Sequence, residues 1–405
     1  MADKFEWFDR GRFGMFIHWG LFAMGGIGCW QKNFERGTNE QWEKYANNFD
    51  PDLFNPEEWA KCAKEAGMKY FVLTAKHHEG FCLFDSKYTD YKYKKKDLLA
   101  GVINAFRNEG LRIGVYYSLP DWHHPNYPHD KRHPQRDIPY EPDTKPYTEY
   151  VHNQVREILT NYGKIDLLWF DGSYPDTLHI WECERLNKMI RELQPEILVC
   201  RLPGFDDFST PEATIPQQGL FNEDGTPKHW EGCQISHGEW SYVREKKWKT
   251  SKELVEMLIR HTSRGGNLLL NFGPTSRGCF DDHTKEVLAD IGKWMKWNGK
   301  AIHSCCGAPA EYPEPEGCRY TWNPETNRLY VHFLSWPDRR IDLPGLAGKV
   351  EYAQLLCDGC EIKFTENLYG NVNGPTLPEP GALRMTLPID SPRDCLVPVV
   401  ELILK

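Results

Sequence analysis

The stretch LLWFDGSYPDT, residues 167–177, runs from a block of apolar residues directly into an acid, Asp171, and a glycine. An Asp-Gly pair is common in turns, so a plain strand end is the simplest interpretation. The alternative is that a buried strand serves as a rigid mount for a reactive carboxylate. The residues at the ends of the neighbouring strands decide between the two.

Further short apolar runs predict buried strands, because they are rich in β-branched and aromatic residues. With 164–170, these runs are 13–17, 69–75, 111–118, 196–201 and 266–272. Stretches with helical spacing separate them, at 56–67, 97–110, 147–163, 183–195 and 252–266. Alternation of strand and helix over roughly 290 residues predicts an α/β fold with a parallel sheet, and at this size a (β/α)8-like barrel.

Two points stay open at this stage. A doubly wound open sheet is the alternative, weakened because no G-x-G-x-x-G motif follows the first strand. At least one barrel strand, between residues 201 and 266, is hard to place from the sequence. From residue 303 onward, short alternating strands and many prolines predict an antiparallel β-sandwich. The expected domains are therefore residues 1–300 and 301–405.

Bulk properties exclude several classes of partner. The formal net charge of −9 disfavours nucleic acid or an anionic membrane. No apolar run approaches the ~20 residues of a membrane span, and the first residues lack the apolar core of a signal peptide. We therefore expect a cytoplasmic protein, unless a leader was removed. The 13 scattered cysteines predict reduced thiols without a zinc set. The oligomeric state stays open, a homo-oligomer included.

Polar or aromatic side chains stand at the carboxyl ends of the predicted strands, where barrel enzymes hold their reactive groups. This convergence favours an active site over a turn at Asp171. Each residue also has a structural interpretation, since most isolated histidines in cores only satisfy hydrogen bonds. A metal site at the histidine pair would need a loop and a carboxylate, so no metal is expected. The set is His18, His77, His78, Tyr116, Tyr117, Asp171 and Arg201.

The 15 Trp, 19 Tyr and 20 Phe residues suit a sugar ligand, which offers an apolar ring face and a rim of hydroxyls. Glycoside hydrolysis needs a second carboxyl group opposite Asp171. Spacing alone does not select it. The candidates are Asp206, Asp207, Glu212, Glu223, Asp224 and Glu231.

Six motifs, in order, resemble the α-L-fucosidases of glycoside hydrolase family 29 over most of residues 7–300. They are RFGMFIHWG (12–20), AKHHEGFCLFDSKYTDY (75–91), GVYYSLPDWHHP (114–125), LLWFDG (167–172), WEGC (230–233) and GGNLLLNFGPTSRG (265–278). The resemblance implies a (β/α)8-like barrel with a C-terminal β-sandwich. It also implies a retaining double displacement on a fucosylated oligosaccharide or glycoconjugate, without metal or organic cofactor.

The resemblance also implies roles for individual residues. Asp171 matches the nucleophile, and Glu212, in DDFSTPEAT, matches the acid/base, with Glu231 as the runner-up. The remaining residues would bind the sugar, with only one of the two tyrosines facing it and Trp240 lying against the C6 methyl group. These are His18, Trp30, His77, His78, Tyr116, Tyr117, Arg201, Glu231 and Trp240.

One position departs from the family pattern. Cys29 precedes Trp30 where many members carry a glutamate, and Glu35 or Glu40 nearby would have to compensate. The forms WFDG and TPE resemble the branch that prefers α-1,3/1,4-linked fucose. The alternatives are a retaining glycosidase or transglycosidase for a related sugar such as an α-L-galactoside, a non-catalytic fucose-binding protein, and a metal-dependent hydrolase or isomerase.

Overall fold

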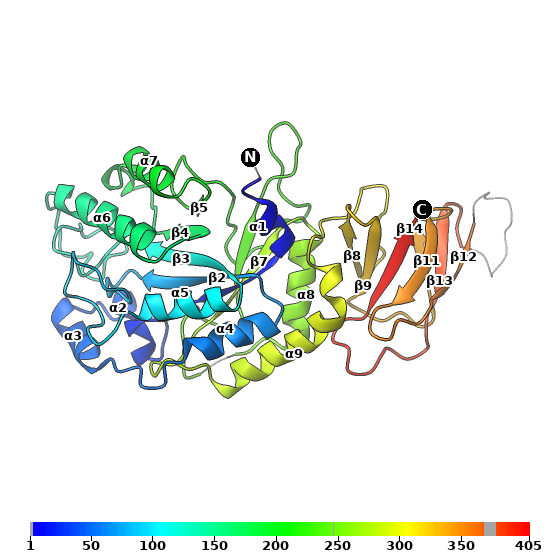
Figure 1. The fold of residues 1–405 in the computed structure, drawn as a ribbon, viewed down its shortest axis with the longest axis horizontal. Helices are drawn as coiled ribbons and strands as arrows, with labels where there is room; N and C mark the ends of the chain where they lie inside the picture. The colour runs from blue at the N-terminus through cyan, green and yellow to red at the C-terminus, as the bar shows by residue number, and fades with distance from the viewer. Residues whose placement is uncertain (1–2, 246, 368–377) are drawn as a thin grey trace.

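The computed structural model describes residues 3–245, 247–367 and 378–405 (Figure 1). The helices are α1 (Glu6–Gly11), η1 (Leu21–Met24), α2 (Gln31–Phe34), α3 (Asn39–Asn48), α4 (Pro56–Glu65), α5 (Leu98–Asn108), α6 (Lys145–Asn161), η2 (Leu178–Ile180), α7 (Cys183–Leu193), α8 (Ser251–Thr262), α9 (Asp282–Asn298) and η3 (Gly299–Ala301). The strands are β1 (Phe13–Ile17), β2 (Tyr70–Lys76), β3 (Arg112–Ser118), β4 (Leu167–Asp171), β5 (Leu198–Cys200), β6 (Glu231–Ile235), β7 (Asn267–Phe272), β8 (Cys318–Asn323), β9 (Arg328–Phe333), β10 (Arg340–Pro344), β11 (Val350–Leu355), β12 (Lys363–Glu366), β13 (Ala382–Thr386) and β14 (Val399–Leu404).

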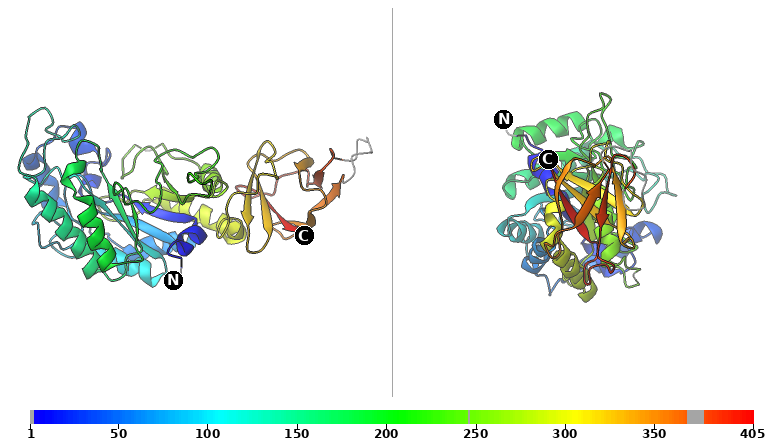
Figure 2. Two further views of the ribbon diagram at one scale, coloured as in Figure 1. Left: turned by 90° about the horizontal axis from the view of Figure 1, so that it is seen from above. Right: turned by 90° about the vertical axis from the view of Figure 1, so that its right-hand side faces the viewer.

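The described N-terminal part forms a curled half-barrel of seven parallel strands in the order β5-β4-β3-β2-β1-β7-β6. Every residue of β1, β2 and β7 is buried, as in parallel sheets covered on both faces. Helices cover the outer face of this sheet (Figures 1 and 2). All the predicted strands and helices of this part are present, which confirms the α/β class.

The strand that the sequence did not place is β6, and the described residues contain no eighth parallel strand. Segment 207–213 instead runs beside β6, making isolated parallel bridges from Ser209 to Trp230 and from Glu212 to Cys233. Pro211 has no N–H to donate and Ala213 has a φ of 52°, so a regular strand does not form here. The expectation of eight strands is therefore met only as a seven-stranded half-barrel.

Local sequence fixes where the outer helices begin and end. Asn55 accepts a hydrogen bond from the N–H of Glu58 at 3.2 Å, which caps α4. Thr250 and Glu253 form a reciprocal capping box at the start of α8. After α4 the chain turns at Gly67 with a φ of 83°, a conformation that glycine adopts without strain.

The C-terminal part consists of two antiparallel sheets, β10-β13-β12 and β11-β14-β9-β8. Leu343 and Leu383 of the first sheet and Val331 and Leu402 of the second belong to one buried hydrophobic cluster. This part lies at one end of the long axis of the molecule (Figure 2). In α9, Trp294 donates a hydrogen bond to the carbonyl of Val397 at 2.7 Å and so connects the two parts. The antiparallel β architecture is confirmed, while the sandwich and the domain boundary at 300/301 stay predictions.

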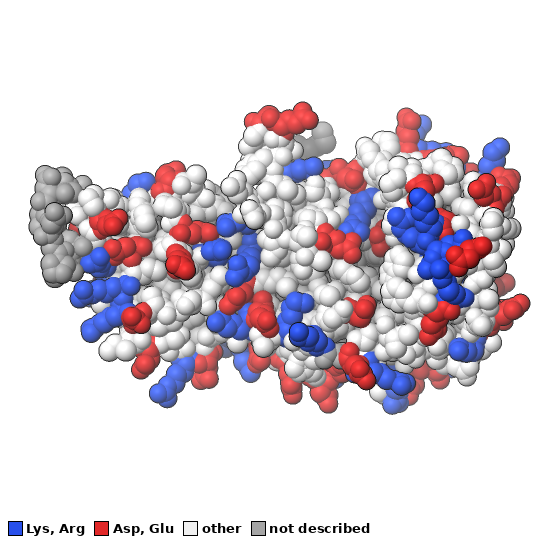
Figure 3. All heavy atoms as spheres, turned by 180° about the vertical axis from the view of Figure 1, so that it is seen from behind, with Lys and Arg blue, Asp and Glu red and all other residues white. Residues whose placement is uncertain are grey.

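Acidic and basic side chains are interspersed over the face of the molecule seen in Figure 3, as the modest net negative charge suggests. No helix among the described residues is both long and apolar enough to cross a membrane. All 13 cysteines are free thiols, and Cys360 is the exposed one.

A buried histidine of β9, His332, makes the free energy of unfolding depend on pH. Thr321 donates its hydroxyl hydrogen to the carbonyl of Ala301 at 2.6 Å, so it accepts from Nε2–H of His332 at 2.8 Å. Nδ1 of His332 is buried and has no hydrogen-bond partner among the described residues. Burial therefore lowers the pKa of His332 to about 3, well below its usual value.

We expect the free energy of unfolding to fall as the pH falls from about 6.5 toward 3, because the unfolded state binds the proton first. For His332 the loss between about pH 7 and pH 4.5 is about 2 kcal/mol. Urea denaturation at both pH values measures it. The variant His332→Gln, which keeps the hydrogen bond to Thr321, should lose about that much less on acidification. An equal loss in both proteins would contradict this assignment.

Candidate active site

A small cavity of about 130 Å³ lies at the carboxyl ends of the half-barrel strands. Its volume suits a single sugar ring rather than a chain of several. Eight of the eleven residues predicted for the site line it. The lining residues are Phe16, His18, Cys29, Trp30, His77, Tyr116, Trp169, Asp171, Tyr174, Arg201, Glu212, Cys233 and Trp240.

Asp171 is the last residue of β4, and four groups surround its carboxylate. Oδ1 accepts from Nη1 of Arg201 at 3.1 Å and from the N–H of Gly172 at 2.8 Å. Oδ2 accepts from the hydroxyl of Tyr116 at 2.8 Å and lies 3.6 Å from Nε2 of His78. Burial opposes ionisation, but His78 in its protonated form, the guanidinium of Arg201 and the hydrogen bond from Tyr116 lower the pKa of Asp171 to about 2. The carboxylate is therefore ionised at neutral pH.

Arg201 connects the two predicted carboxylates. It follows β5 directly, with a φ of 57°, and its guanidinium lies over the ring of Trp169 at 4.3 Å. Nη1 donates to Asp171, and Nη2 donates to Oε2 of Glu212 at 2.9 Å. Nε donates to the hydroxyl of Thr210 at 2.9 Å, which fixes the plane of the guanidinium. One rigid cation thus holds both acids at the same cavity.

Glu212 stands at the mouth of this cavity. Its side chain is 49% exposed, against 22% for Asp171. The hydrogen bond from the N–H of Ala213 to the carbonyl of Cys233 fastens this part of the chain to β6. The loop that carries Glu212 is therefore anchored beside the half-barrel strands, although the sequence offers no element there.

The three predicted histidines differ in position. His18 and His77 line the cavity, whereas His78 lies behind Trp30 with its Nε2 toward Asp171. Nδ1 of His18 pairs with Oδ1 of Asn271 at 2.7 Å, and the amide nitrogen of Asn271 donates to Trp240 O. Nδ1 is therefore the protonated nitrogen, and Nε2 is an acceptor. Burial, and then His77, lower the pKa of His18 to about 3.

The aromatic residues divide as strand alternation requires. Tyr116 faces the cavity and donates to Asp171, while Tyr117 points outward and donates to Gln154 of α6 at 2.8 Å. Trp30 and Trp240 line the cavity.

The structure does not bring Glu231 into the cavity. Glu231 begins β6, so it lies near the amino ends of the strands, while Asp171 ends β4. Its side chain is fully buried, and it accepts from the hydroxyl of Tyr70 at 2.5 Å and from Nε1 of Trp169 at 3.3 Å. Burial raises the pKa of Glu231 to about 7. These contacts place it below Trp169, out of reach of a bound sugar.

Four lining residues were not singled out from the sequence, namely Phe16, Trp169, Tyr174 and Cys233. Trp169 and Phe16 alternate with residues that face the helices, a signal that strand parity could have supplied. Tyr174, in the loop after β4, also lines the cavity and lies under the guanidinium of Arg132 at 3.6 Å.

Cys29 lines the cavity in place of the family's glutamate, and neither acid proposed to compensate for it does so. Glu35 accepts a hydrogen bond from Gln31 at 3.0 Å, and Glu40 lies in α3. Glu239 lies closer, since a Cβ on Gly28 would be 3.1 Å from its Oε2. Among the described residues, no group of three His, Cys, Asp or Glu side chains is arranged to hold a metal ion.

Comparison with known proteins connects this geometry to a family. The family model for α-L-fucosidase matches residues 2–300. Mouse tissue α-L-fucosidase is 30% identical over 89% of this chain and 88% of its own length. Human plasma α-L-fucosidase is 31% identical over 82% of this chain and 76% of its own length.

Solved structures give the same result. α-L-Fucosidase isoenzyme 1 from Paenibacillus thiaminolyticus has a TM-score of 0.93 and 43% identity, over 100% of this chain and 99% of its own. A Bacteroides thetaiotaomicron α-L-fucosidase, with a TM-score of 0.86 and 28% identity, covers 100% of this chain and 97% of its own. That structure holds a covalent intermediate with 2-fluoro-fucosyl fluoride, trapped in a glutamate-to-glutamine mutant.

Proposed function

The chain belongs to the α-L-fucosidase family of glycoside hydrolases, and on that premise we propose that it is an exo-acting retaining α-L-fucosidase. It removes terminal α-L-fucosyl residues from glycans. The observation that carries this proposal is the ionised Asp171 at a cavity the size of one sugar ring, with Glu212 on the same guanidinium. Two carboxylates on one guanidinium suit a retaining mechanism, which needs about 5–5.5 Å between the two carboxyl groups.

In the proposed reaction Asp171 attacks C1 of the fucosyl unit. The bond from C1 to the leaving oxygen breaks, and that oxygen takes a proton from Glu212. The product is a covalent β-fucosyl ester of Asp171. Glu212 then removes a proton from water, the water oxygen attacks C1, and Asp171 leaves as a carboxylate. The covalent intermediate trapped in the Bacteroides relative supports this scheme.

The cavity walls supply the sugar contacts of this proposal. His18 and His77 line the cavity, and the bare Nε2 of His18 accepts a hydrogen bond from a sugar hydroxyl. Trp240 and Phe16, with ring centroids 6.2 Å apart, form an apolar wall for the C6 methyl group. Burying a methyl group contributes roughly 1 kcal/mol, which favours a 6-deoxy sugar. Within this activity, the resemblance supports a preference for α-1,3/1,4-linked fucose.

We expect turnover of p-nitrophenyl α-L-fucoside with retention, and a kcat/KM for the matching α-L-galactoside roughly 10–200-fold lower, because an added hydroxyl must be desolvated against this wall. Anomer-resolved NMR and steady-state kinetics measure both, and linkage-defined oligosaccharides in the same assay test the linkage preference. Trp240→Ala should reduce the ratio of kcat/KM between the fucoside and the galactoside. Phe34→Ala, at an exposed position outside the cavity lining, should leave this ratio unchanged.

The rival functions give different results in this experiment. A faster galactoside would assign the enzyme to that related sugar. Saturable binding of fucose without any turnover would make the chain a fucose-binding protein, the reading that Cys29 keeps open. Loss of turnover on chelation would contradict the reaction proposed above.

A further inference from the structure

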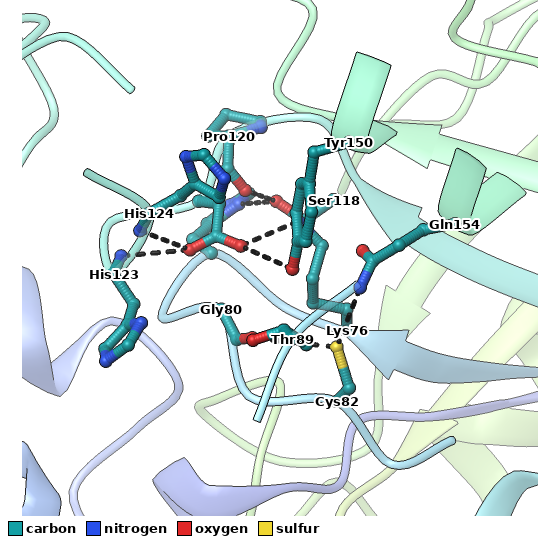
Figure 4. Close-up of polar contacts among 12 residues, drawn as sticks. Lys76, Gly80, Cys82, Thr89, Ser118, Pro120, His123, His124, Tyr150 and Gln154 are labelled. Carbon is teal, nitrogen blue, oxygen red and sulfur yellow. Dashed lines mark hydrogen bonds and ion pairs between the residues drawn. The ribbon is translucent and has the colours of Figure 1, made fainter. Parts of the chain in front are cut away.

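A buried ion pair begins at the residue that precedes the paired histidines in the chain. Lys76 ends β2, next to His77, and its Nζ lies 3.3 Å from Oδ2 of Asp121. Both side chains are at most 2% exposed. The ammonium also lies over the ring of Tyr117 at 4.6 Å. Figure 4 shows this cluster, in which Lys76 and Tyr150 converge from β2 and α6. Neither charge contacts the cavity, so the chemistry of Asp171 and Glu212 does not account for the pair.

Asp121 joins three segments of the chain. Its Oδ1 accepts from the N–H groups of His123 at 2.9 Å and His124 at 3.0 Å, and its Oδ2 accepts from Tyr150 at 3.4 Å. Gly80 turns past this carboxylate with a φ of 89°, and a Cβ there would lie 2.1 Å from Oδ1. The loops after β2 and β3 are thus locked together around one carboxylate.

Contacts between the same two loops also orient His78. The N–H of Trp122 donates to the carbonyl of His78 at 2.7 Å. Ser118 donates its hydroxyl hydrogen to the carbonyl of Pro120 at 2.6 Å, so its oxygen accepts from Nδ1–H of His78 at 2.7 Å. Nε2 of His78 is then bare when the ring is neutral, and it lies 3.6 Å from Oδ2 of Asp171.

The charge of His78 decides what Asp171 can do. A protonated ring would pair with Oδ2 of Asp171 and engage the lone pair of the oxygen that must attack C1. A neutral ring leaves that oxygen to Tyr116 alone. The titratable groups facing His78 are Asp171, which favours protonation, and Lys76, His77 and His18, which oppose it. Burial first, and then the neighbouring His77, Lys76 and His18, hold the pKa of His78 well below its usual range.

We propose that Lys76, paired with Asp121, is a positioning residue that keeps His78 uncharged beside Asp171, and so leaves the nucleophile free to attack. A buried ion pair seldom adds stability beyond what apolar residues of similar volume provide, so stability alone gives no reason for a charge here. An electrostatic effect on His78 does give a reason for a charge at this position. The inference rests on the proposed fucosidase function and deepens it.

The test compares Lys76→Met with Asp121→Asn, since both break the same ion pair and disturb the same packing. Removing the cation lets His78 bind a proton at higher pH, so the acid limb of kcat/KM for p-nitrophenyl α-L-fucoside should move up by about one pH unit in Lys76→Met. Asp121→Asn keeps the cation, so its limb should not move up. A merely structural role predicts the same displacement, or none, in both. Either of these results overturns the proposal.

A double variant distinguishes an effect on folding from an effect on the protonation of His78. The double variant Lys76→Met/Asp121→Asn leaves no unpaired buried charge, and its acid limb should lie above that of Asp121→Asn by about the same pH unit. Histidine-selective NMR reports the protonation of His78 without any turnover. No turnover by the parent protein would remove the fucosidase proposal. An active parent with an unmoved His78 titration in the double variant would remove only this one.

Discussion

Replacing Asp171 with alanine should lower kcat for p-nitrophenyl α-L-fucoside by more than about a thousandfold, or roughly 4 kcal/mol of barrier. A good leaving group needs no proton, so this loss isolates the nucleophile from the acid. The structure supports the expectation because Arg201 and Tyr116 both contact the carboxylate and, against the opposing effect of burial, help to keep the pKa of Asp171 below its usual value. Asp171→Asn should lose a similar factor, since an amide keeps the volume but not the nucleophilic charge.

Stereochemistry sharpens this prediction. Alanine leaves space on the face that Asp171 occupied, and added azide can attack C1 from there. The expected product is the inverted β-L-fucosyl azide, identified by NMR. Asp176→Asn is the matched control, because Asp176 lies five residues along the same loop, outside the cavity lining, and pairs with Arg132. Full activity of Asp171→Ala, or a 2-fluoro-fucosyl label on another residue of the parent protein, would refute the assignment.

Continuous apolar runs made most of the half-barrel predictable. The sequence between Phe13 and Phe272 carries such runs at six of the seven parallel strands, because strands buried on both faces need them. β6 was missed because EGCQI is short and interrupted by Glu231 and Gln234. Helix α3 was missed because Trp42 is its only buried residue. Strand signals depend on apolar residues, and β6 is buried but polar at two of its positions, whereas α3 has a single buried residue.

The site was predictable where it lies on strands and unpredictable where it depends on loops. Alternation foretold that one of Tyr116 and Tyr117 would face the cavity. The position of Glu212 depends on how segment 207–213 lies against β6, which no local pattern encodes. Glu231 looked like a site residue because its strand was not placed, so its location at the amino end of that strand was hidden.

The second large effect concerns the acid/base, where geometry and proton affinity point to different residues. Burial raises the pKa of Glu231 to about 7, which suits a group that must be protonated near neutrality. Glu231, however, is enclosed by Tyr70 and Trp169 and does not reach the cavity. Glu212 stands at the cavity mouth on the guanidinium that also holds Asp171. An acid must reach the leaving oxygen before its pKa matters, so we expect Glu212 to transfer the proton.

Glu212→Ala should therefore lower kcat/KM for fucosylated oligosaccharides by about 10²–10⁴-fold, and for p-nitrophenyl α-L-fucoside much less, because only the natural leaving group needs the proton. Azide should restore turnover of the aryl substrate by attacking the covalent intermediate, and the product should be the retained α-L-fucosyl azide. Glu231→Gln, which preserves an acceptor for Trp169, should lose stability and stay within about tenfold of the parent on both substrates. The opposite pattern would be leaving-group dependence and azide rescue in a Glu231 variant and neither of these in Glu212→Ala. It would assign the proton transfer to Glu231, a residue that must first move out from behind Trp169. Such a result would mean that the half-barrel rearranges when the sugar binds.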